Sequence, residues 1–208
     1  MKGLKTMTAS AGRVLMFVEN SFPQDTRVKN EADTLTNAQY EVTVVALRKR
    51  GQPSHEVLDG IRVYRIPRLE LFKKTPGQKP GRWARALTRV KSLVGYVSEY
   101  VYFTAACLGM SILLGLRHGF DVIHAHNPPD TLFLVALPWK LLGKKYVFDH
   151  HDLCPELYRS RYGASRDILA RLLQFVEWCN LKLADVTIAT NDSYKNLHLT
   201  RGGRRSGE

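Results

Sequence analysis

The side chains most able to do chemistry lie in and just after a short apolar segment near the middle of the chain. Residues 122–126 alternate in the manner of a buried strand, and Pro128 and Pro129 prevent its continuation. In an open parallel sheet, ligands bind beyond the carboxyl ends of the strands. His126, at that end, can donate or accept a hydrogen bond near neutral pH, although a capped strand with one structural histidine gives the same pattern.

Polar side chains also follow the other predicted strands. Apolar and β-branched runs predict these strands at residues 13–18, 41–47, 61–66, 146–149 and 186–190. Because parallel strands end at one edge of a sheet, we expect the side chains that follow them to line a binding site. The candidate substrate-binding residues are Asp25, Arg27, Asn127, Asp130, His151, Asp152, Glu156 and Asn191. Capping of following helices by Asp25, Asp130 and Asp192 is the alternative, and it is compatible with phosphate binding there.

Three histidines at this edge raise the alternative of a metal site. His124 and His126 would lie on the same face of their strand, and His151 would join them from the next loop. Such a cluster suits zinc and would make the protein a metal-dependent hydrolase. His124 would, however, lie deeper in the sheet than His126, away from an open coordination position. We therefore expect no metal at this site.

Strands that alternate with helices define the expected fold. Apolar periodicity predicts helices at residues 25–38, 82–116 and 164–183. Polar loops are predicted at residues 48–60 and 67–81. This order is typical of an α/β fold, and we expect one Rossmann-like domain with a doubly wound parallel sheet at residues 13–200. Residues 1–12 are expected to form a disordered tail, and residues 201–208 a polar tail.

Composition indicates a globular, cytoplasmic protein. Of the 208 residues, 44% are hydrophobic, which is enough for a packed core. The three cysteines lie far apart and form neither a CxxC nor a Cys/His zinc pattern, and the first dozen residues contain no signal segment. The absence of GxGxxG, GxxxxGK(S/T) and GxSxG motifs argues against a dinucleotide dehydrogenase, a P-loop enzyme and an α/β-hydrolase.

A basic segment suggests a membrane surface as a partner. The net charge is +12, and residues 62–91 contain ten basic residues and one acidic residue. Arg82, Arg85 and Arg89 fall on one face of the helix predicted there. Trp83 lies on another face, and this division is typical of helices that lie on an anionic membrane, although packing against the sheet gives it too. Nucleic acid is a poorer fit, because the segment has few aromatic residues and no recognition motif.

The same predicted helix continues into an uncharged run at residues 100–116. A helix needs about 20 apolar residues to span a membrane, so this run lies at the short limit. It also contains alanine, glycine, serine and threonine. We therefore expect a buried crossover helix rather than a spanning one.

Several segments resemble family 4 glycosyltransferases, in the same order along the chain. These segments are residues 20–32, 40–46, 121–127, 149–156 and 184–191. Together they extend the resemblance over residues 13–203. Two positions depart from the family pattern: the loop after the first strand contains no glycine, and Gln39 stands where the family favours glycine.

The resemblance implies a GT-B enzyme, in which two Rossmann-like domains face each other across a cleft and no metal is needed. This chain would be the amino-terminal, acceptor-binding domain, and a second domain would bind the nucleotide-sugar. His126 would be the catalytic residue that reaches the transferred sugar. Asp25, Arg27, His151 and Asn191 would line the acceptor side. The donor motif Glu-x7-Glu does not occur in the sequence, so we expect transfer only when a donor domain completes the protein.

Two functions remain open at this point besides the metal-dependent hydrolase. The first is a glycosyltransferase domain for a lipid-linked or polysaccharide acceptor. The second is a non-catalytic subunit that recruits a separate donor-domain chain to an anionic membrane. Both place the protein in the cytoplasm, peripherally on the inner face of the membrane.

Overall fold

The computed structural model describes the backbone of residues 10–69, 82–162 and 168–203, and their side chains apart from those of 82–93 and 161–162. Most of the expected tails, 1–12 and 201–208, lies outside these residues, as does most of the predicted loop 67–81. Within them the first strand begins at residue 12 and the last helix ends at residue 202.

Seven strands form one sheet in the described part of the chain. They are β1 (Gly12–Val18), β2 (Tyr40–Arg48), β3 (His55–Leu58), β4 (Ile61–Pro67), β5 (Val122–His126), β6 (Lys145–His150) and β7 (Val186–Ala189). Their order is β3-β4-β2-β1-β5-β6-β7, and every pair is parallel except β3 with β4. The strand order reverses between β1 and β5, as in doubly wound sheets. The predicted α/β fold with a Rossmann-like sheet is therefore confirmed.

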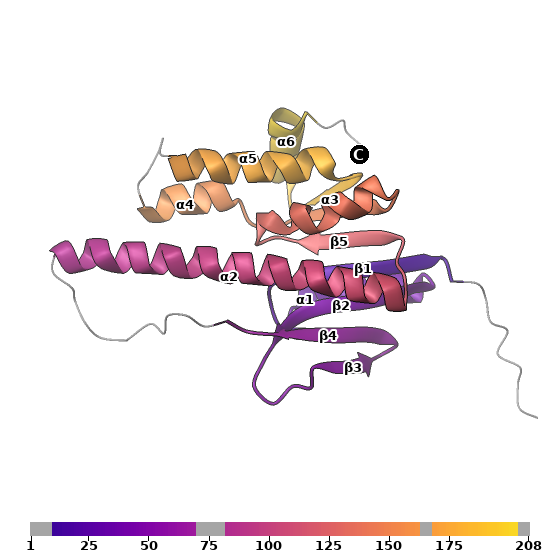
Figure 1. The fold of residues 1–208 in the computed structure, drawn as a ribbon. Helices are drawn as coiled ribbons and strands as arrows, with labels where there is room; N and C mark the ends of the chain where they lie inside the picture. The colour runs from indigo at the N-terminus through magenta and orange to yellow at the C-terminus, as the bar shows by residue number, and fades with distance from the viewer. Residues whose placement is uncertain (1–9, 70–81, 163–167, 204–208) are drawn as a thin grey trace, which may run out of the picture.

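Helices cover both faces of this sheet (Figure 1). They are α1 (Thr26–Asn37), α2 (Arg82–Arg117), the short 3-10 helix η1 (Asp130–Leu132), α3 (Phe133–Leu141), α4 (Cys154–Tyr162), α5 (Ile168–Leu183) and α6 (Asp192–Gly202). In Figure 1, α2, α3, α4 and α5 lie in front of the sheet and α1 lies behind it. The long α2 is the crossover between β4 and β5, and it extends past the edge of the sheet.

Alternation along the central strands divides the core between the two faces. Leu15 and Phe17 of β1 belong to the core under α2 and α3. Met16 and Val18 belong to the core under α1. All four are at most 4% exposed, so both faces of β1 are packed, as expected for the centre of a parallel sheet. Each such side chain stabilises the fold by roughly 1.5–3 kcal/mol.

Three elements differ from the sequence prediction. The predicted loop 48–60 contains β3, an edge strand of four residues whose side chains are only half buried, so its alternation signal is weak. Helix α3 was not predicted, because Pro138 interrupts its apolar run. The predicted helix 164–183 corresponds to α5, which begins at Ile168, and the separate α4 before it was missed.

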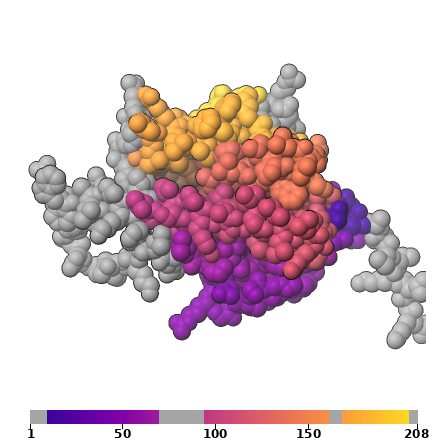
Figure 2. Space-filling model, viewed as in Figure 1, coloured from indigo at the N-terminus to yellow at the C-terminus, as the bar shows by residue number. Residues whose placement is uncertain are grey.

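Helix α2 is only partly the buried crossover helix that the sequence predicted. One side packs into the core through Phe103, Cys107 and Leu114. The other side is exposed, with Val101 at 60% and Leu116 at 83% exposure. Residues 94–117 are long and apolar enough to cross a membrane by length and composition alone. Only 28% of the most apolar 18-residue stretch within them is buried. Figure 2 shows α2 crossing the middle of this open face, with α3 and α5 above it.

Candidate active site

The carboxyl ends of β1, β5 and β6 form the sheet edge where the strand order reverses. His126, the last residue of β5, pairs in register with Val18 of β1 and Asp149 of β6. Its side chain is almost fully buried. Open parallel sheets bind ligands at such a switch point. His126 therefore lies where the sequence placed it, at a position suited to a ligand.

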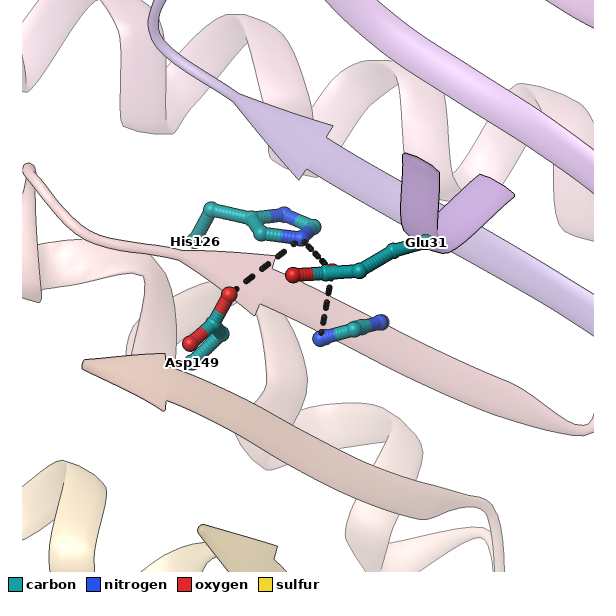
Figure 3. Close-up of side chains that lie close together, drawn as sticks. Glu31, His126 and Asp149 are labelled. Carbon is teal, nitrogen blue, oxygen red and sulfur yellow. Dashed lines mark hydrogen bonds and ion pairs between the residues drawn. The ribbon is translucent and has the colours of Figure 1, made fainter. Parts of the chain in front are cut away.

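Both ring nitrogens of His126 are hydrogen-bonded, and Figure 3 shows the contacts of Nε2 with Glu31 and Asp149. Nδ1 lies 3.0 Å from the carbonyl oxygen of Phe17 and donates to it, because a carbonyl only accepts. Nε2 lies 2.7 Å from Oε2 of Glu31 and 3.8 Å from Oδ2 of Asp149. Burial raises the pKa of Glu31, but the hydrogen bond and charge of His126 outweigh burial and lower this pKa below its usual value. The carboxylate of Glu31 is therefore ionised near neutral pH and acts as the acceptor of its hydrogen bond with Nε2 of His126.

Glu31 reaches His126 from α1. Val28 and Ala32 are fully buried one turn apart and anchor this helix against the sheet. Glu31 follows Val28 by three residues and so lies on the same side of the helix. Glu31 and Asp149 were both missed as site residues, because an acid in an amphipathic helix normally faces solvent and Asp149 belongs to a buried strand. The available signal was their place in segments that resemble family 4 glycosyltransferases.

Two further histidines surround His126. The ring of His124 lies 4.3 Å from that of His126, and burial lowers the pKa of His124 well below its usual value. Its Nε2 lies 3.6 Å from Oε2 of Glu31 and has no hydrogen-bond partner among the described residues. His151 points its Nε2 at Oδ2 of the fully buried Asp149, at 2.5 Å. The site therefore gathers three imidazoles and two carboxylates at one strand edge.

Part of this cluster has the composition of a metal site. Ligand atoms of Glu31, His124, His126 and Asp149 lie within 4.8 Å of one another. Two imidazoles and two carboxylates form a donor set that zinc accepts. The sequence had placed His151 beside His124 and His126 instead of the two carboxylates. His151 contacts Asp149 and does not belong to this group of four.

Asn127 organises the two loops beside His126. Its Oδ1 accepts hydrogen bonds from the backbone N–H groups of His151 at 2.6 Å and Asp152 at 3.1 Å. Its Nδ2 donates to Asp130 Oδ1 at 2.8 Å and to the carbonyl of Asp152 at 2.6 Å. Burial raises the pKa of Asp130 to about 7. These contacts fix the loops, and a direct contact of Asn127, Asp130 or Asp152 with substrate stays a prediction.

Comparison with known proteins identifies a family whose match includes the residues at this edge of the sheet. A family model described as a glycosyl transferase 4-like domain matches residues 24–206. The chain belongs to this family. The match includes α1 with Glu31, β5 with His126 and β6 with Asp149. The resemblance found in the sequence is therefore confirmed, and no curated protein matches the chain.

Solved structures place the glycosyl transferase 4-like domain within a larger architecture. A sucrose-phosphate synthase from Thermosynechococcus elongatus is 16% identical, with a TM-score of 0.53, and the match covers 91% of this chain and 45% of the synthase. A second structure of that synthase is 12% identical, with a TM-score of 0.53, and the match covers 89% of this chain and 80% of the other. The chain spans 45% of the length of the first of these structures. Its fold is that of a Rossmann-like half of a GT-B glycosyltransferase.

Asp25 and Arg27 form a pair at the start of α1 in this family domain. Asp25 occupies the N-cap position, but its carboxylate accepts hydrogen bonds from Asn20 at 3.0 Å and from Arg27 at 3.2 Å rather than capping the helix. Burial raises the pKa of Asp25, and these partners outweigh burial and lower it. The Arg27 side chain is 52% exposed, and the charges of Asp149 and Asp152 act on it. Arg27 therefore leaves a guanidinium group accessible beside the His126 cluster.

Glu156 and Asn191 serve other contacts in the family domain. Glu156 pairs with Arg201 of α6, which also binds Glu177 of α5 at 2.9 Å. Asn191 accepts a hydrogen bond from the backbone N–H of Tyr194 at 3.1 Å and so caps α6, a role the sequence had given to Asp192. The printed contacts of both residues are with the α4–α6 region rather than with His126, and their contact with substrate stays a prediction.

The predicted membrane-surface residues, Arg82, Trp83, Arg85 and Arg89, belong to the first turns of α2. Their side chains lie outside the described residues. The fold establishes only that these residues share a helix with the apolar stretch that follows.

Proposed function

We propose that this chain is the acceptor-binding part of a glycosyltransferase. It would position a lipid-linked or polysaccharide acceptor for a sugar that a donor-binding domain supplies from a nucleotide-sugar. The observation that carries the proposal is the buried His126, fixed by Phe17 and Glu31 at the switch point of a family-matched sheet. No metal is required for this role.

The geometry around His126 suits sugar transfer because the reaction needs orientation and charge stabilisation more than covalent chemistry. The ring of His126 is held beside two carboxylates, Glu31 and Asp149. A sugar hydroxyl that displaces Glu31 from Nε2 can bond to the imidazole and to a carboxylate. Exposed Arg27 adds a positive charge that favours an approaching phosphate.

The test is transfer of label from a panel of nucleotide-sugars to a lipid extract of the native host. It compares the purified chain alone with the chain plus a soluble lysate from a strain that lacks it. We expect transfer only with the lysate, reduced by roughly 100-fold or more in His126→Ala. Transfer by the chain alone, or equal transfer by His126→Ala, would contradict the proposal. Recruitment of a partner to the membrane without transfer would indicate the non-catalytic subunit.

An anionic membrane surface is the proposed location of the acceptor, on the inner face of the cytoplasmic membrane. Three helices on one face of the sheet expose large apolar side chains: Val94, Val97, Val101, Ile112 and Leu116 of α2, Leu134, Leu137 and Leu141 of α3, and Ile168, Leu172, Phe175 and Trp178 of α5. Figure 2 views this face. Soluble monomers rarely expose apolar surface on this scale. The net charge of +12 adds attraction to anionic lipid.

Sedimentation with vesicles tests this location. We expect the chain to bind phosphatidylglycerol vesicles much more strongly than phosphatidylcholine vesicles, with a partial loss at high salt. Equal recovery in the supernatant with both lipids would contradict membrane binding. Salt-insensitive binding to both lipids would show that the apolar face acts without the basic charge.

A metal-dependent hydrolase remains a second candidate because of one observation, the four clustered ligand atoms of Glu31, His124, His126 and Asp149. It predicts about one zinc per chain after purification without chelator, and loss of the metal in both His124→Ala and Glu31→Gln. Metal-free protein that still supports transfer in the lysate assay would exclude this candidate.

A further inference from the structure

A cavity lies between α2 and the carboxyl ends of β1, β2 and β4, on the face of the sheet opposite α1. Its volume is about 280 Å³, and its wall includes Glu19, Arg68, Tyr96, Glu99, Tyr100 and Phe103. We call this cavity the α2 pocket. Small-molecule sites occupy roughly 300–1,000 Å³, so the α2 pocket has room for one small polar unit. It contains none of the site residues predicted from the sequence.

The α2 pocket adjoins the His126 site across the edge of the sheet. Val18, the last residue of β1, pairs in register with His126, and Glu19 directly follows the strand. Val18 packs on the α1 side, while Glu19 lines the pocket on the α2 side. Adjacent strands are about 4.8 Å apart. The α2 pocket and His126 therefore lie at the same end of the sheet, on opposite faces.

The walls of the α2 pocket combine aromatic rings with carboxylates. Tyr96 is 37% exposed and Tyr100 is half buried, so both rings border open space. Carboxylates accept hydrogen bonds from hydroxyl groups, and aromatic faces pack against the C–H face of a ring. Two acidic residues face one arginine, Arg68, which disfavours a phosphate. These features fit a ring that carries hydroxyl groups and no negative charge.

We propose that the α2 pocket binds one uncharged sugar unit of the acceptor, with its ring against tyrosine and its hydroxyl groups bonded to Glu19 and Glu99. That this sugar belongs to the acceptor rests on the function proposed above. Tyr96 and Tyr100 belong to α2, whose exposed residues, Val97 and Val101, form part of the apolar face. A lipid-linked sugar can therefore enter the pocket while its lipid stays in the membrane.

The ionisation of Glu19 agrees with a hydroxyl-rich ligand. Burial raises the pKa of Glu19 to about 7, the charge of Glu99 adds to this effect, and Arg68 opposes it. Near neutral pH, Glu19 is therefore protonated in a large fraction of molecules. A protonated carboxyl group both donates and accepts hydrogen bonds, as do the sugar hydroxyls it would meet.

The test is saturation-transfer NMR on the purified chain with defined probes. The neutral probes are methyl glucoside, methyl galactoside and N-acetylglucosamine, and the charged probes are glucose 6-phosphate and uridine diphosphate. The pocket variants are Tyr96→Ala, Glu99→Gln and the isosteric Glu19→Gln. Glu41→Gln is the matched control, because Glu41 pairs with Arg62 near the opposite, amino end of β2. Thermal unfolding establishes that each variant is folded.

We expect at least one neutral sugar to bind, and its signal to fall roughly fivefold in Tyr96→Ala and Glu99→Gln. Glu41→Gln keeps the signal. Binding that survives all folded pocket variants, no binding of any neutral sugar, or stronger binding of glucose 6-phosphate would overturn the inference. If one of these results is found while transfer still depends on His126, only the inference about the pocket fails and the proposed function stands. Sugar binding in the pocket without transfer under any condition would instead contradict the proposed function.

Discussion

The two faces of the central sheet differ in what they present to their surroundings. Behind the sheet, α1 buries Val28 and Ala32 and turns polar groups outward, such as the Lys29–Asp33 ion pair at 2.6 Å. None of the large apolar side chains that are exposed in the described residues belongs to α1. In front of it, α2, α3 and α5 cover the core and also expose apolar side chains.

This difference separates two requirements of the same fold. The α1 face needs only to be soluble and to hold Glu31 against His126. The front helices have a buried side that stabilises the sheet and an exposed side that the fold itself does not require. Apolar surface that folding does not use is best explained by contact with something outside the molecule.

The largest expected effect separates the two sides of α2. Phe103 is 1% exposed and Leu116 is 83% exposed. Phe103→Ala should lower the free energy of unfolding by about 3–5 kcal/mol, because it leaves a cavity in the core. Leu116→Ala should change it by no more than about 0.5 kcal/mol. Urea unfolding followed by circular dichroism measures both, and similar losses would show that the front face is ordinary core.

A second prediction compares exposed apolar residues on two elements. Val101→Ser with Leu116→Ser should weaken binding to anionic vesicles by roughly tenfold or more, because about 1–2 kcal/mol is lost for each side chain. Val57→Ser is the control, because Val57 has the same 60% exposure as Val101 but lies on the edge strand β3. Vesicle sedimentation gives both affinities. An equal loss in the control would remove the distinction between the front helices and the rest of the surface.

The third prediction concerns Asp130, which lies in η1 between α2 and α5. Burial raises its pKa from 3.8 to about 7, so the folded state binds more protons than the unfolded state between these values. Stability therefore falls as pH rises through this window. Asp130→Asn should raise the free energy of unfolding by on the order of 2 kcal/mol near pH 8 and have little effect near pH 4. Thermal unfolding at both pH values checks this, and a pH-independent effect would contradict it.

The fourth prediction concerns Glu31 on the α1 face. Glu31→Gln keeps the shape of the side chain and a hydrogen-bonding oxygen for His126, and it should destabilise the fold by only about 1 kcal/mol. It should still lower transfer in the lysate assay, because the negative charge beside the ring of His126 is lost. Loss of folding in Glu31→Gln would show that Glu31 is a structural residue rather than a positioning one.

The sequence predicted most of the sheet and only part of the site. Alternation identified β1, β2 and β5, and the proline-stiffened loop identified His126 as an edge residue. The short, half-exposed β3 has too few buried positions for this signal. Helical periodicity did not identify Glu31, because its partner His126 lies 95 positions away and only the packing of α1 brings the two together.

The apolar face shows a limit of a different kind. Helical periodicity in α2 predicts apolar residues on its surface, but it does not distinguish residues that pack on the sheet, such as Phe103, from those that do not, such as Val101. That distinction depends on the position of the sheet. The α2 pocket was missed for the same reason, because Glu19, Tyr96 and Arg68 come from three separate segments.

The most direct test of the central claim is calorimetric titration of the purified chain with a panel of nucleotide-sugars. It is made with and without anionic liposomes, and with His126→Ala beside the unmodified chain. We predict that liposomes bind and that no nucleotide-sugar binds tightly, as expected of an acceptor-binding half. Tight binding of a nucleotide-sugar that His126→Ala abolishes would place the donor site in this chain and contradict the account.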